Sequence, residues 1–389
     1  MADAPFANYQ YEIYLGGLGG QTPDLPVAYD ELEAAARERL TPGAYGYVAG
    51  GAGSEDTMRA NREAFRRWRI VPRFLRDVSS RDLSTEILGT TLPAPVMLAP
   101  VGVQSIVHPE GEVAVARAAA SVGVPMILST ASSFAMEEVA DAMGDVPRWY
   151  QLYWPRDPSV ATSFVQRAEK AGYSAIVITL DTFILAWRPR DLQTAYLPFL
   201  KAEGVANYFS DPAFRAGLEK SPEEDQQAAV MHFVGMFGDP TKTWENLAAV
   251  KEATSLPVLL KGVLHPGDAR RAVELGMDGI IVSNHGGRQV DGSIGALDAL
   301  PGVVAAVGGD IPVLFDSGVR TGSDAFKAIA LGARAVLLGR PWVWGLALAG
   351  EQGVRSVLRS FLAELDLTFA LSGFTSPAEL SPEVLARVE

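Results

Sequence analysis

Short apolar segments recur at least eight times between residues 94 and 341, and this repeat constrains the fold more than any other feature. Each segment is almost continuously apolar rather than alternating, which is typical of strands covered on both faces. We therefore predict strands at 94–100, 125–130, 148–153, 175–181, 258–263, 279–285, 312–318 and 335–341.

Segments with apolar residues at helical spacing separate most of these predicted strands. Four end just before a glycine, a common signal for the end of a helix: 111–122, 159–171, 266–275 and 324–331. Another predicted helix spans 243–254. Repeated strand–helix units predict a parallel sheet, and eight units predict a closed α/β barrel of the (β/α)₈ type. An open, doubly wound sheet is the alternative.

Residues 1–93 precede the first predicted strand and do not follow the repeat. Two predicted helices, at 27–40 and 54–68, lie on either side of a glycine-rich turn at 49–53. We expect this N-terminal helical extension to pack across a barrel domain that spans 94–380.

A long insertion, 182–242, separates the fourth predicted strand from its helix. Connections of this length are often functional lids. We interpret the insertion as a lid because it leaves directly from Asp181; the alternative is a surface excursion without function. Its middle, 219–227, is too polar to bury, and we expect it to be mobile.

Composition narrows the class of protein. The 389 residues are 48% hydrophobic, enough for one large core with additions or for two ordinary domains. A net charge of −13 disfavours nucleic acid as a partner. With no cysteine, disulfides, thiolate zinc sites and cysteine nucleophiles are excluded, and no residue is assigned to a metal. Neither a secretory signal nor a membrane span is recognisable, so we expect a soluble cytoplasmic protein without a membrane partner.

Polar residues end several of the predicted strands. A parallel barrel places the C-terminal ends of all its strands on one rim, where barrel enzymes carry their active sites. Asp181, Lys261, His285 and Asp316 each stand at such an end. An acid, a lysine and a base are therefore predicted to converge on one pocket.

His285 is the candidate base. It ends an apolar strand and is followed by two glycines, which allow a tight turn under a ligand, and then by Arg288. A base beside a guanidinium suits a substrate that carries both an acidic proton and a carboxylate. The alternative is a strand-end histidine held by a backbone carbonyl. The other histidines are interpreted as capping or surface residues: His108, His232 and His265.

The remaining polar residues at the predicted rim have more than one interpretation. Asp181 is either a helix cap or the partner that supports His285 as a base. Lys261 either forms a Schiff base, as in an aldolase, or supplies a fixed positive charge to a cofactor. Arg188 and Arg190, at the start of the insertion, each either hold a carboxylate or face solvent.

Glycines and arginines follow the last two predicted strands, at 316–320 and 339–340. Backbone amides after strands seven and eight of a barrel commonly bind phosphate. The glycine clusters at 16–20 and 50–53 do not follow a strand, so neither is read as a dinucleotide fingerprint. One phosphate site without such a fingerprint favours a mononucleotide.

Together these segments resemble the FMN-dependent α-hydroxy-acid oxidase and dehydrogenase family. The likeness runs in order from Asp30 to Leu380. Its motifs are QLY at 151–153, ITLDT at 178–182, LLKGV at 259–263, SNHGGRQ at 283–289, DSGVRTG at 316–322 and LGRP at 338–341. Within the family, the lactate 2-monooxygenases are the most similar group, through YEIYLGGLGG at 11–20, DTFILAWRPRDL at 181–192 and NYFSDPAF at 207–214.

The resemblance implies FMN at the barrel rim, a small L-2-hydroxy acid as substrate, O2 as oxidant, and a homo-oligomer, either a tetramer or an octamer. It also implies that His285 is the base and Asp181 its partner, while Arg288 and Arg188 bind the substrate carboxylate. The tyrosines implied to touch the substrate carboxylate and hydroxyl are Tyr47 and Tyr153.

Implied contacts to FMN fall into four sets. The resemblance places Lys261 beside the flavin N1 and C2 carbonyl. The other flavin-ring contacts are Ser129, Gln151, Thr179 and Ser283. The ribityl and phosphate contacts are Asp316, Gly318, Arg320, Gly339 and Arg340. The backbone implied to lie against the flavin face near N5 comprises Pro100, Val101 and Gly102.

The products released depend on whether the enzyme retains the keto acid and peroxide in its site. A monooxygenase holds keto acid and peroxide together and releases acetate, CO2 and water from lactate, whereas an oxidase releases both products. Gly102 matches the monooxygenases, while many oxidases of the family have alanine there. We therefore expect lactate 2-monooxygenase activity, with a lactate or 2-hydroxy-acid oxidase as the alternative. A Schiff-base aldolase and a barrel that only binds or scaffolds are more distant alternatives.

Overall fold

Eight parallel strands form a closed barrel in the computed structural model, which describes residues 6–388. The barrel strands are β4 (Val96–Leu98), β5 (Met126–Ser129), β6 (Arg148–Leu152), β7 (Ile176–Thr179), β8 (Val258–Lys261), β9 (Gly279–Val282), β10 (Val313–Phe315) and β11 (Val336–Leu338). β11 pairs with β4, and this pairing closes the sheet. The predicted barrel is confirmed, and the open doubly wound sheet was wrong.

The barrel interior is filled by one apolar layer with a residue from every strand. This layer comprises Met97, Ile127, Trp149, Val177, Leu259, Ile281, Leu314 and Leu337. Side chains two positions further along a strand point the same way. The next layer toward the C-terminal rim is therefore Ala99, Ser129, Gln151, Thr179, Lys261, Ser283, Asp316 and Gly339. The polar residues at the C-terminal ends of the strands thus form a layer next to the apolar barrel interior.

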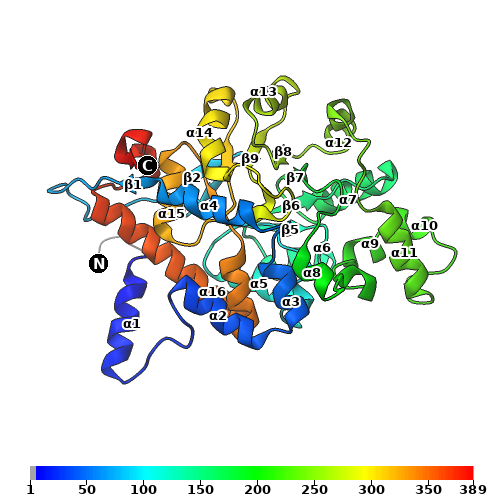
Figure 1. Cartoon of the computed structure of the whole chain (residues 1–389), viewed down its shortest axis with the longest axis horizontal. Coiled ribbons are helices and arrows are strands. Elements are labelled where there is room, and N and C mark those ends of the chain that lie inside the picture. The colour runs from blue at the N-terminus through cyan, green and yellow to red at the C-terminus, as the bar shows by residue number, and fades with distance from the viewer. Residues whose placement is uncertain (1–5, 389) are drawn as a thin grey trace.

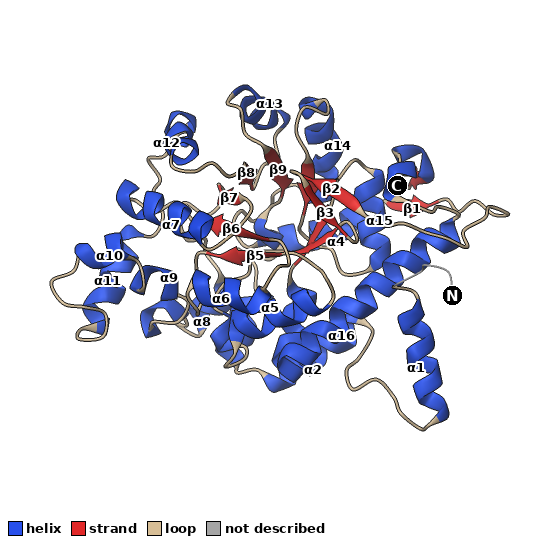
Figure 2. Cartoon of the chain, turned by 180° about the vertical axis from the view of Figure 1, so that it is seen from behind, coloured by secondary structure: helices blue, strands red, loops and turns tan. Residues whose placement is uncertain are grey.

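Helices surround the barrel, as Figure 2 shows. The predicted helices correspond to α5 (Gly111–Ser121), α7 (Pro158–Lys170), α12 (Leu247–Glu252, with a preceding 3₁₀ turn), α13 (Pro266–Glu274) and α15 (Gly322–Ala330). Three others were not predicted: α6 (Met136–Met143), α14 (Ala296–Val307) and the long α16 (Arg340–Ser372). α16 contains a break in its helical backbone at Ala349 and Gly350.

The N-terminal residues form more helix than was predicted. The observed helices are α1 (Asn8–Leu18), α2 (Tyr29–Arg39), α3 (Pro42–Ala49) and α4 (Asp56–Arg66). α2 contacts α16, and α1 projects from the same side of the molecule (Figure 1). α4 packs on the barrel rim, where the amides of Asn61 and Asn284 exchange two hydrogen bonds of 2.7 and 2.8 Å. A division of the chain at residue 93 stays a prediction.

Short strands complete the fold outside the barrel. β1 (Trp68–Ile70) pairs with β12 (Leu385–Arg387), so the chain continues in ordered structure past the predicted boundary at 380. The hairpin of β2 (Thr85–Ile87) and β3 (Thr90–Leu92) packs against the interior apolar layer. No helix among the described residues is both long enough and apolar enough to span a bilayer.

The insertion at 182–242 folds into short helices on the opposite side of the molecule from α1 (Figure 1). These helices are α8 (Pro189–Gln193), α9 (Ala206–Phe209), α10 (Pro212–Ala216) and α11 (Gln226–Met236). They share an aromatic cluster of Phe199, Tyr208, Phe214, Phe233 and Phe237. The polar middle forms an exposed connection, and the Asp225 side chain caps α11. Its predicted mobility stays a prediction.

Candidate active site

A cavity opens at the C-terminal rim of the barrel, where the polar layer lies. Counted with its open mouth, it encloses about 1030 Å³. The predicted site residues that line it are Tyr47, Pro100, Val101, Gly102, Tyr153, Arg188, Lys261, His285, Arg288, Asp316, Gly318, Arg320, Gly339 and Arg340. Of the four predicted strand-end residues, Lys261, His285 and Asp316 line this one pocket, whereas Asp181 does not line it and contacts His285 instead.

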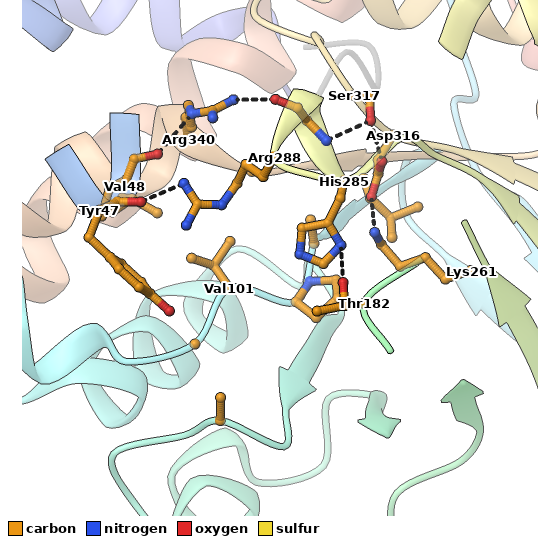
Figure 3. A pocket seen from close by; sticks show the side chains of 18 of the residues that line it. Tyr47, Val48, Val101, Thr182, Lys261, His285, Arg288, Asp316, Ser317 and Arg340 are labelled. Atoms are coloured by element: carbon orange, nitrogen blue, oxygen red, sulfur yellow. Dashed lines mark hydrogen bonds and ion pairs between the residues drawn. The ribbon is translucent and has the colours of Figure 1, made fainter. Parts of the chain in front are cut away.

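His285 lies between a carboxylate and the cavity. Its Nδ1 donates to Asp181 Oδ1 at 2.8 Å, and the Thr182 hydroxyl lies 3.2 Å from the same nitrogen (Figure 3). With Nδ1 protonated, Nε2 carries the lone pair and can accept a proton. The Tyr153 hydroxyl is 3.4 Å from this Nε2.

Burial and the contact between His285 and Asp181 together set the charges of these two side chains. It lowers the pKa of His285 below its ordinary value, although Asp181 opposes the shift. Burial raises the pKa of Asp181, but His285 and Lys261 outweigh it, so that the pKa lies below its ordinary value. The resting pair at neutral pH is thus a neutral imidazole and a carboxylate, as a general base requires.

The backbone of this turn is left-handed. His285 has a φ of 58°, and Gly286 and Gly287 continue at 65° and 78°. A histidine in this region is uncommon and persists only where its surroundings hold it. The Ser283 hydroxyl accepts from the His285 amide at 3.0 Å, and the Ser317 hydroxyl accepts from the Gly286 amide at 3.0 Å. The turn directs the imidazole into the cavity.

Two arginines supply positive charge beside the base. Arg288 donates to the backbone carbonyls of Tyr47 and Gly50 at 2.5 and 2.8 Å, and its guanidinium lies over the Tyr47 ring (Figure 3). Burial and the nearby Arg188 lower the pKa of Arg288 to about 9, so it stays charged at neutral pH. Arg188 donates to the Arg288 carbonyl and to the Gln289 side chain.

Arg190 resolves the choice that the sequence left open at the start of the insertion. It does not line the cavity and pairs instead with Glu55, at 2.7 Å. Arg188, which is buried and lines the cavity, is therefore the insertion arginine placed to bind a carboxylate.

A second positive region lies beside the first, after β10 and β11. Arg340 donates to the carbonyls of Val48, Gly50 and Gly286, and burial lowers its pKa to about 10. Arg320 lies beside it and stacks on the Tyr29 ring. Gly339 faces open space, since a Cβ built there would meet no atom within 4 Å.

Lys261 is paired with a carboxylate. Its Nζ lies 3.1 Å from Asp316 Oδ2 and donates to the Ser283 hydroxyl at 2.9 Å (Figure 3). In a Schiff-base enzyme the lysine nitrogen attacks a carbonyl, whereas here the nitrogen is already bonded to a carboxylate and a hydroxyl. The contact therefore favours the interpretation of Lys261 as a fixed charge over the aldolase.

Four predicted flavin contacts lie in the polar layer without lining the cavity: Ser129, Gln151, Thr179 and Ser283. They are buried, and hydrogen bonds link neighbouring strands through them. The Gln151 side chain accepts from the Ser129 hydroxyl at 3.1 Å and donates to the Thr179 hydroxyl at 2.9 Å. Their contact with a cofactor stays a prediction.

Several lining residues were not predicted from the sequence. The insertion contributes an apolar wall of Leu185, Phe199 and Phe237. No local signal distinguishes these side chains from ordinary core residues. Thr182 and Ser317 also line the cavity. Each directly follows a predicted site residue, so both could have been predicted from their position in the sequence.

A neutral imidazole base and two neighbouring arginine regions at the end of a parallel barrel define a site for a carboxylate substrate and a phosphate-bearing ligand. A model of the FMN-dependent dehydrogenase family matches residues 36–387. The chain belongs to the FMN-dependent dehydrogenase family, its cofactor is FMN, and it is a 2-hydroxy-acid oxidoreductase.

Similar proteins support this assignment. An L-lactate oxidase of Lysinibacillus sphaericus is 47% identical over 94% of this chain and 94% of its own length. An FMN-dependent alpha-hydroxy acid dehydrogenase of Penicillium citrinum is 44% identical over 100% of this chain and 98% of its own length. The crystal structure of a mandelate oxidase with (S)-4-hydroxymandelic acid has a TM-score of 0.82 and 41% identity, covering 93% and 98%. These relatives support the predicted family, and they favour the oxidase alternative over the monooxygenase group.

The residues present fit FMN. Among residues 6–388, Arg188, Arg288, Arg320 and Arg340 bond to carbonyl or amide oxygens, and none forms an ion pair with a carboxylate. Positive charge that is partly removed from water without a carboxylate partner is costly, so both arginine regions of the cavity favour anions. A substrate carboxylate suits Arg288 and Arg188, and a phosphate suits Arg320 and Arg340.

Proposed function

We propose that this protein oxidises a small L-2-hydroxy acid with O2 and releases the 2-keto acid and hydrogen peroxide. L-Lactate is the substrate we propose first, because an L-lactate oxidase is among its relatives. The observation that carries the proposal is the neutral His285 imidazole, which shares one cavity with the uncompensated charge of Arg288 and Arg188. The substrate loses two electrons and two protons, and O2 gains both.

Substrate binding begins at the guanidinium pair. Arg288 and Arg188 are placed to bind the carboxylate, and bonds between two charged groups are stronger than neutral ones. The Tyr47 and Tyr153 side chains line the same cavity, and burial raises the pKa of both hydroxyls. Both tyrosines therefore stay protonated and can donate to the substrate.

Proton removal falls to His285. Its Nε2 faces the cavity and accepts a proton from the substrate, either from C2 or from the hydroxyl. Asp181 holds Nδ1–H and stabilises the imidazolium that results. FMN, when bound, would supply the two-electron acceptor between the substrate and O2.

We infer the cofactor contacts from the same layer of residues. Lys261, fixed by Asp316, is placed to stabilise negative charge on the flavin ring. The other proposed ring contacts are Ser129, Gln151, Thr179, Ser283 and the backbone of Pro100, Val101 and Gly102. The proposed ribityl and phosphate contacts are Asp316, Gly318, Arg320, Gly339 and Arg340. We also infer a homo-oligomer, a tetramer or octamer as the resemblance implies.

Gly102 no longer favours the monooxygenase. A Cβ at this position would lie 2.6 Å from the Ala131 carbonyl oxygen and 2.9 Å from the Ala131 side chain. Glycine is therefore explained by the close approach of this loop to β5 and the residues after it. Release of both products is the simpler outcome and agrees with the oxidase relatives.

A larger substrate is the second candidate. The insertion wall of Leu185, Phe199 and Phe237 is apolar and suits an aryl side chain as well as a methyl group. Comparing kcat/KM for L-lactate with that for (S)-mandelate distinguishes the two. A preference for mandelate of tenfold or more would replace lactate as the proposed substrate.

Product analysis tests the proposed outcome. Purified holoenzyme is supplied with L-lactate in air, and pyruvate, hydrogen peroxide and acetate are quantified, with catalase added to one arm. We expect equal amounts of pyruvate and peroxide, with acetate arising only from their slow reaction in solution. In the arm with catalase the peroxide is destroyed, so pyruvate remains and no acetate forms. Acetate that matches lactate consumed, with catalase present, would establish the monooxygenase instead.

A further inference from the structure

The wall of the cavity formed by residues 100–102 continues into a strained loop. Pro100, Val101 and Gly102 line the cavity, and the next residue, Val103, has a φ of 59°. A β-branched residue in this left-handed region is an outlier and persists only where neighbouring groups hold it. The Val103 amide donates to the Ala131 carbonyl at 2.8 Å, which fixes one side of the loop.

Gln104 fixes the wall from behind. Its side chain is 1% exposed, and its Nε2 donates to the Val101 carbonyl at 2.7 Å. That carbonyl accepts no other hydrogen bond within residues 6–388. The orientation of the Val101 peptide in the cavity wall therefore depends on this one amide.

Glu112 in turn holds Gln104. It lies at the start of α5 and is 0% exposed. Its Oε1 accepts from the Gln104 backbone amide at 3.1 Å, whereas its Oε2 has no partner among the described residues. Burial, with a smaller contribution from the nearby Glu203, raises the pKa of Glu112 to about 7, against backbone hydrogen bonds that lower it. Burying a carboxyl group with one unpartnered oxygen costs free energy, so Glu112 is unlike an ordinary core residue.

The insertion holds the same loop from a third side. The Ser105 hydroxyl donates to Glu203, and the Ser133 hydroxyl accepts from the Ser105 amide at 3.2 Å. Gly204 packs so closely on Val103 that a Cβ there would lie 2.7 Å from the valine side chain. The barrel, α5 and the insertion thus meet at one loop, and among residues 6–388 only Gln104 links this junction to the Val101 carbonyl.

We propose that Gln104 and Glu112 are positioning residues for the proposed oxidation, which fix the wall at 100–102 through the Glu112–Gln104–Val101 series of hydrogen bonds. Neither side chain lines the cavity. Their effect on the reaction passes through the wall, and the two residues act as one unit.

The test compares Gln104→Ala, Glu112→Ala, the double variant and Glu112→Gln. Three quantities are measured: the anaerobic rate of flavin absorbance loss with L-lactate, the FMN dissociation constant of the apoprotein, and amide hydrogen exchange at Val103. We expect each single alanine variant to slow the absorbance loss about tenfold, the size that one buried hydrogen bond gives. Substrate KM changes less than about threefold, and Val103 exchanges faster.

Coupling distinguishes positioning from general destabilisation. We expect the double variant to be no slower than the slower single variant, because both break the same series of contacts. Glu112→Gln restores a rate within about threefold of wild type, since its amide oxygen still accepts from Gln104. FMN affinity in all four stays within about tenfold of wild type.

Asp366→Asn is the matched control, a buried carboxylate of α16 that pairs with Arg81 away from the cavity. It is expected to lower the melting temperature without changing Val103 exchange. Additive losses in the double variant, or unchanged exchange at Val103, would overturn the proposal. If wild type itself is not reduced by L-lactate, the proposed substrate fails, and the exchange data alone decide the role of Gln104 and Glu112.

Discussion

His285 and Asp181 show how burial and a single contact set the chemistry of a residue. Burial keeps the imidazole neutral, and the 2.8 Å bond to Asp181 selects the tautomer with a free Nε2. Sequence position predicted that the two residues meet, because they follow β7 and β9, two strands of one parallel barrel whose C-terminal ends share a rim. The pKa of the pair depends on surroundings from several elements, and sequence does not provide it.

Acid pH should impair the enzyme only below the ordinary pKa of histidine. Since the pKa of His285 is lowered, we expect kcat/KM to be level near pH 7 and to fall below about pH 6.5. Asp181→Asn removes the charge that raises this pKa, so the fall should move to still lower pH. The plateau should drop roughly 10²–10⁴-fold, as for loss of general base catalysis. An acid limb above pH 7.5, or one that Asp181→Asn leaves unmoved, would contradict the base assignment.

Arg288 should matter far more than its neighbour Arg190. Arg288→Ala removes the proposed charge partner of the carboxylate. Transition-state binding, read from kcat/KM, should therefore weaken by about 2–5 kcal/mol. Arg190→Ala breaks a partly exposed pair with Glu55 and should weaken transition-state binding by less than about 1 kcal/mol. Steady-state kinetics of both purified variants check this difference. Similar losses in the two would show that the carboxylate does not bind at Arg288.

At the scale of elements, the turn after β9 is the part that tolerates least change. Gly287 has a φ of 78°, and a Cβ there would lie 2.6 Å from Met58 Cγ and 2.8 Å from its backbone nitrogen. We expect Gly287→Ala to destabilise the fold by roughly 1–3 kcal/mol and to weaken FMN binding.

Thermal unfolding measures this effect. Gly235→Ala in α11 is the control, because a Cβ there meets no atom within 4 Å and alanine favours helix by roughly 0.5–1 kcal/mol. The control should keep or raise the melting temperature. Equal melting temperatures for the two variants would mean that the turn after β9 relaxes without cost.

The insertion is expected to act as a lid, and proteolysis tests this. Lys220 is exposed in the connection between α10 and α11, so trypsin should cut there first. Leu185, Arg188, Phe199 and Phe237 reach the cavity from the same insertion, so a bound substrate analogue should slow the cut. First cleavage elsewhere, at a rate that the analogue does not change, would leave the insertion a surface excursion.

Elements with a strong local signal were predicted well, and those without one were missed. Every barrel strand was found because both faces are buried and the runs are continuously apolar. α16 was missed because its start, Arg340–Pro341, was read as the end of the last strand. α3 was missed because the composition PGAYGYVA, rich in glycine, reads as a turn, and only packing makes it a helix.

At the scale of the molecule, the barrel explains why so much of the site was predictable. The strand period of two places each polar residue one layer above an apolar one, so position in the sequence fixes position at the rim. The insertion wall follows no such period. Phe199 and Phe237 reach the cavity only because the insertion folds around its aromatic cluster, and such long-range packing has no local signal.

One measurement tests the central claim that base, guanidinium pair and flavin meet in this cavity. Holoenzyme and His285→Ala are mixed anaerobically with L-lactate while the blue absorbance of the flavin is followed. We predict that wild type is yellow and is bleached, whereas His285→Ala binds FMN equally and stays yellow. Bleaching of His285→Ala at the wild-type rate, or a wild-type protein that cannot bind FMN, would contradict the account.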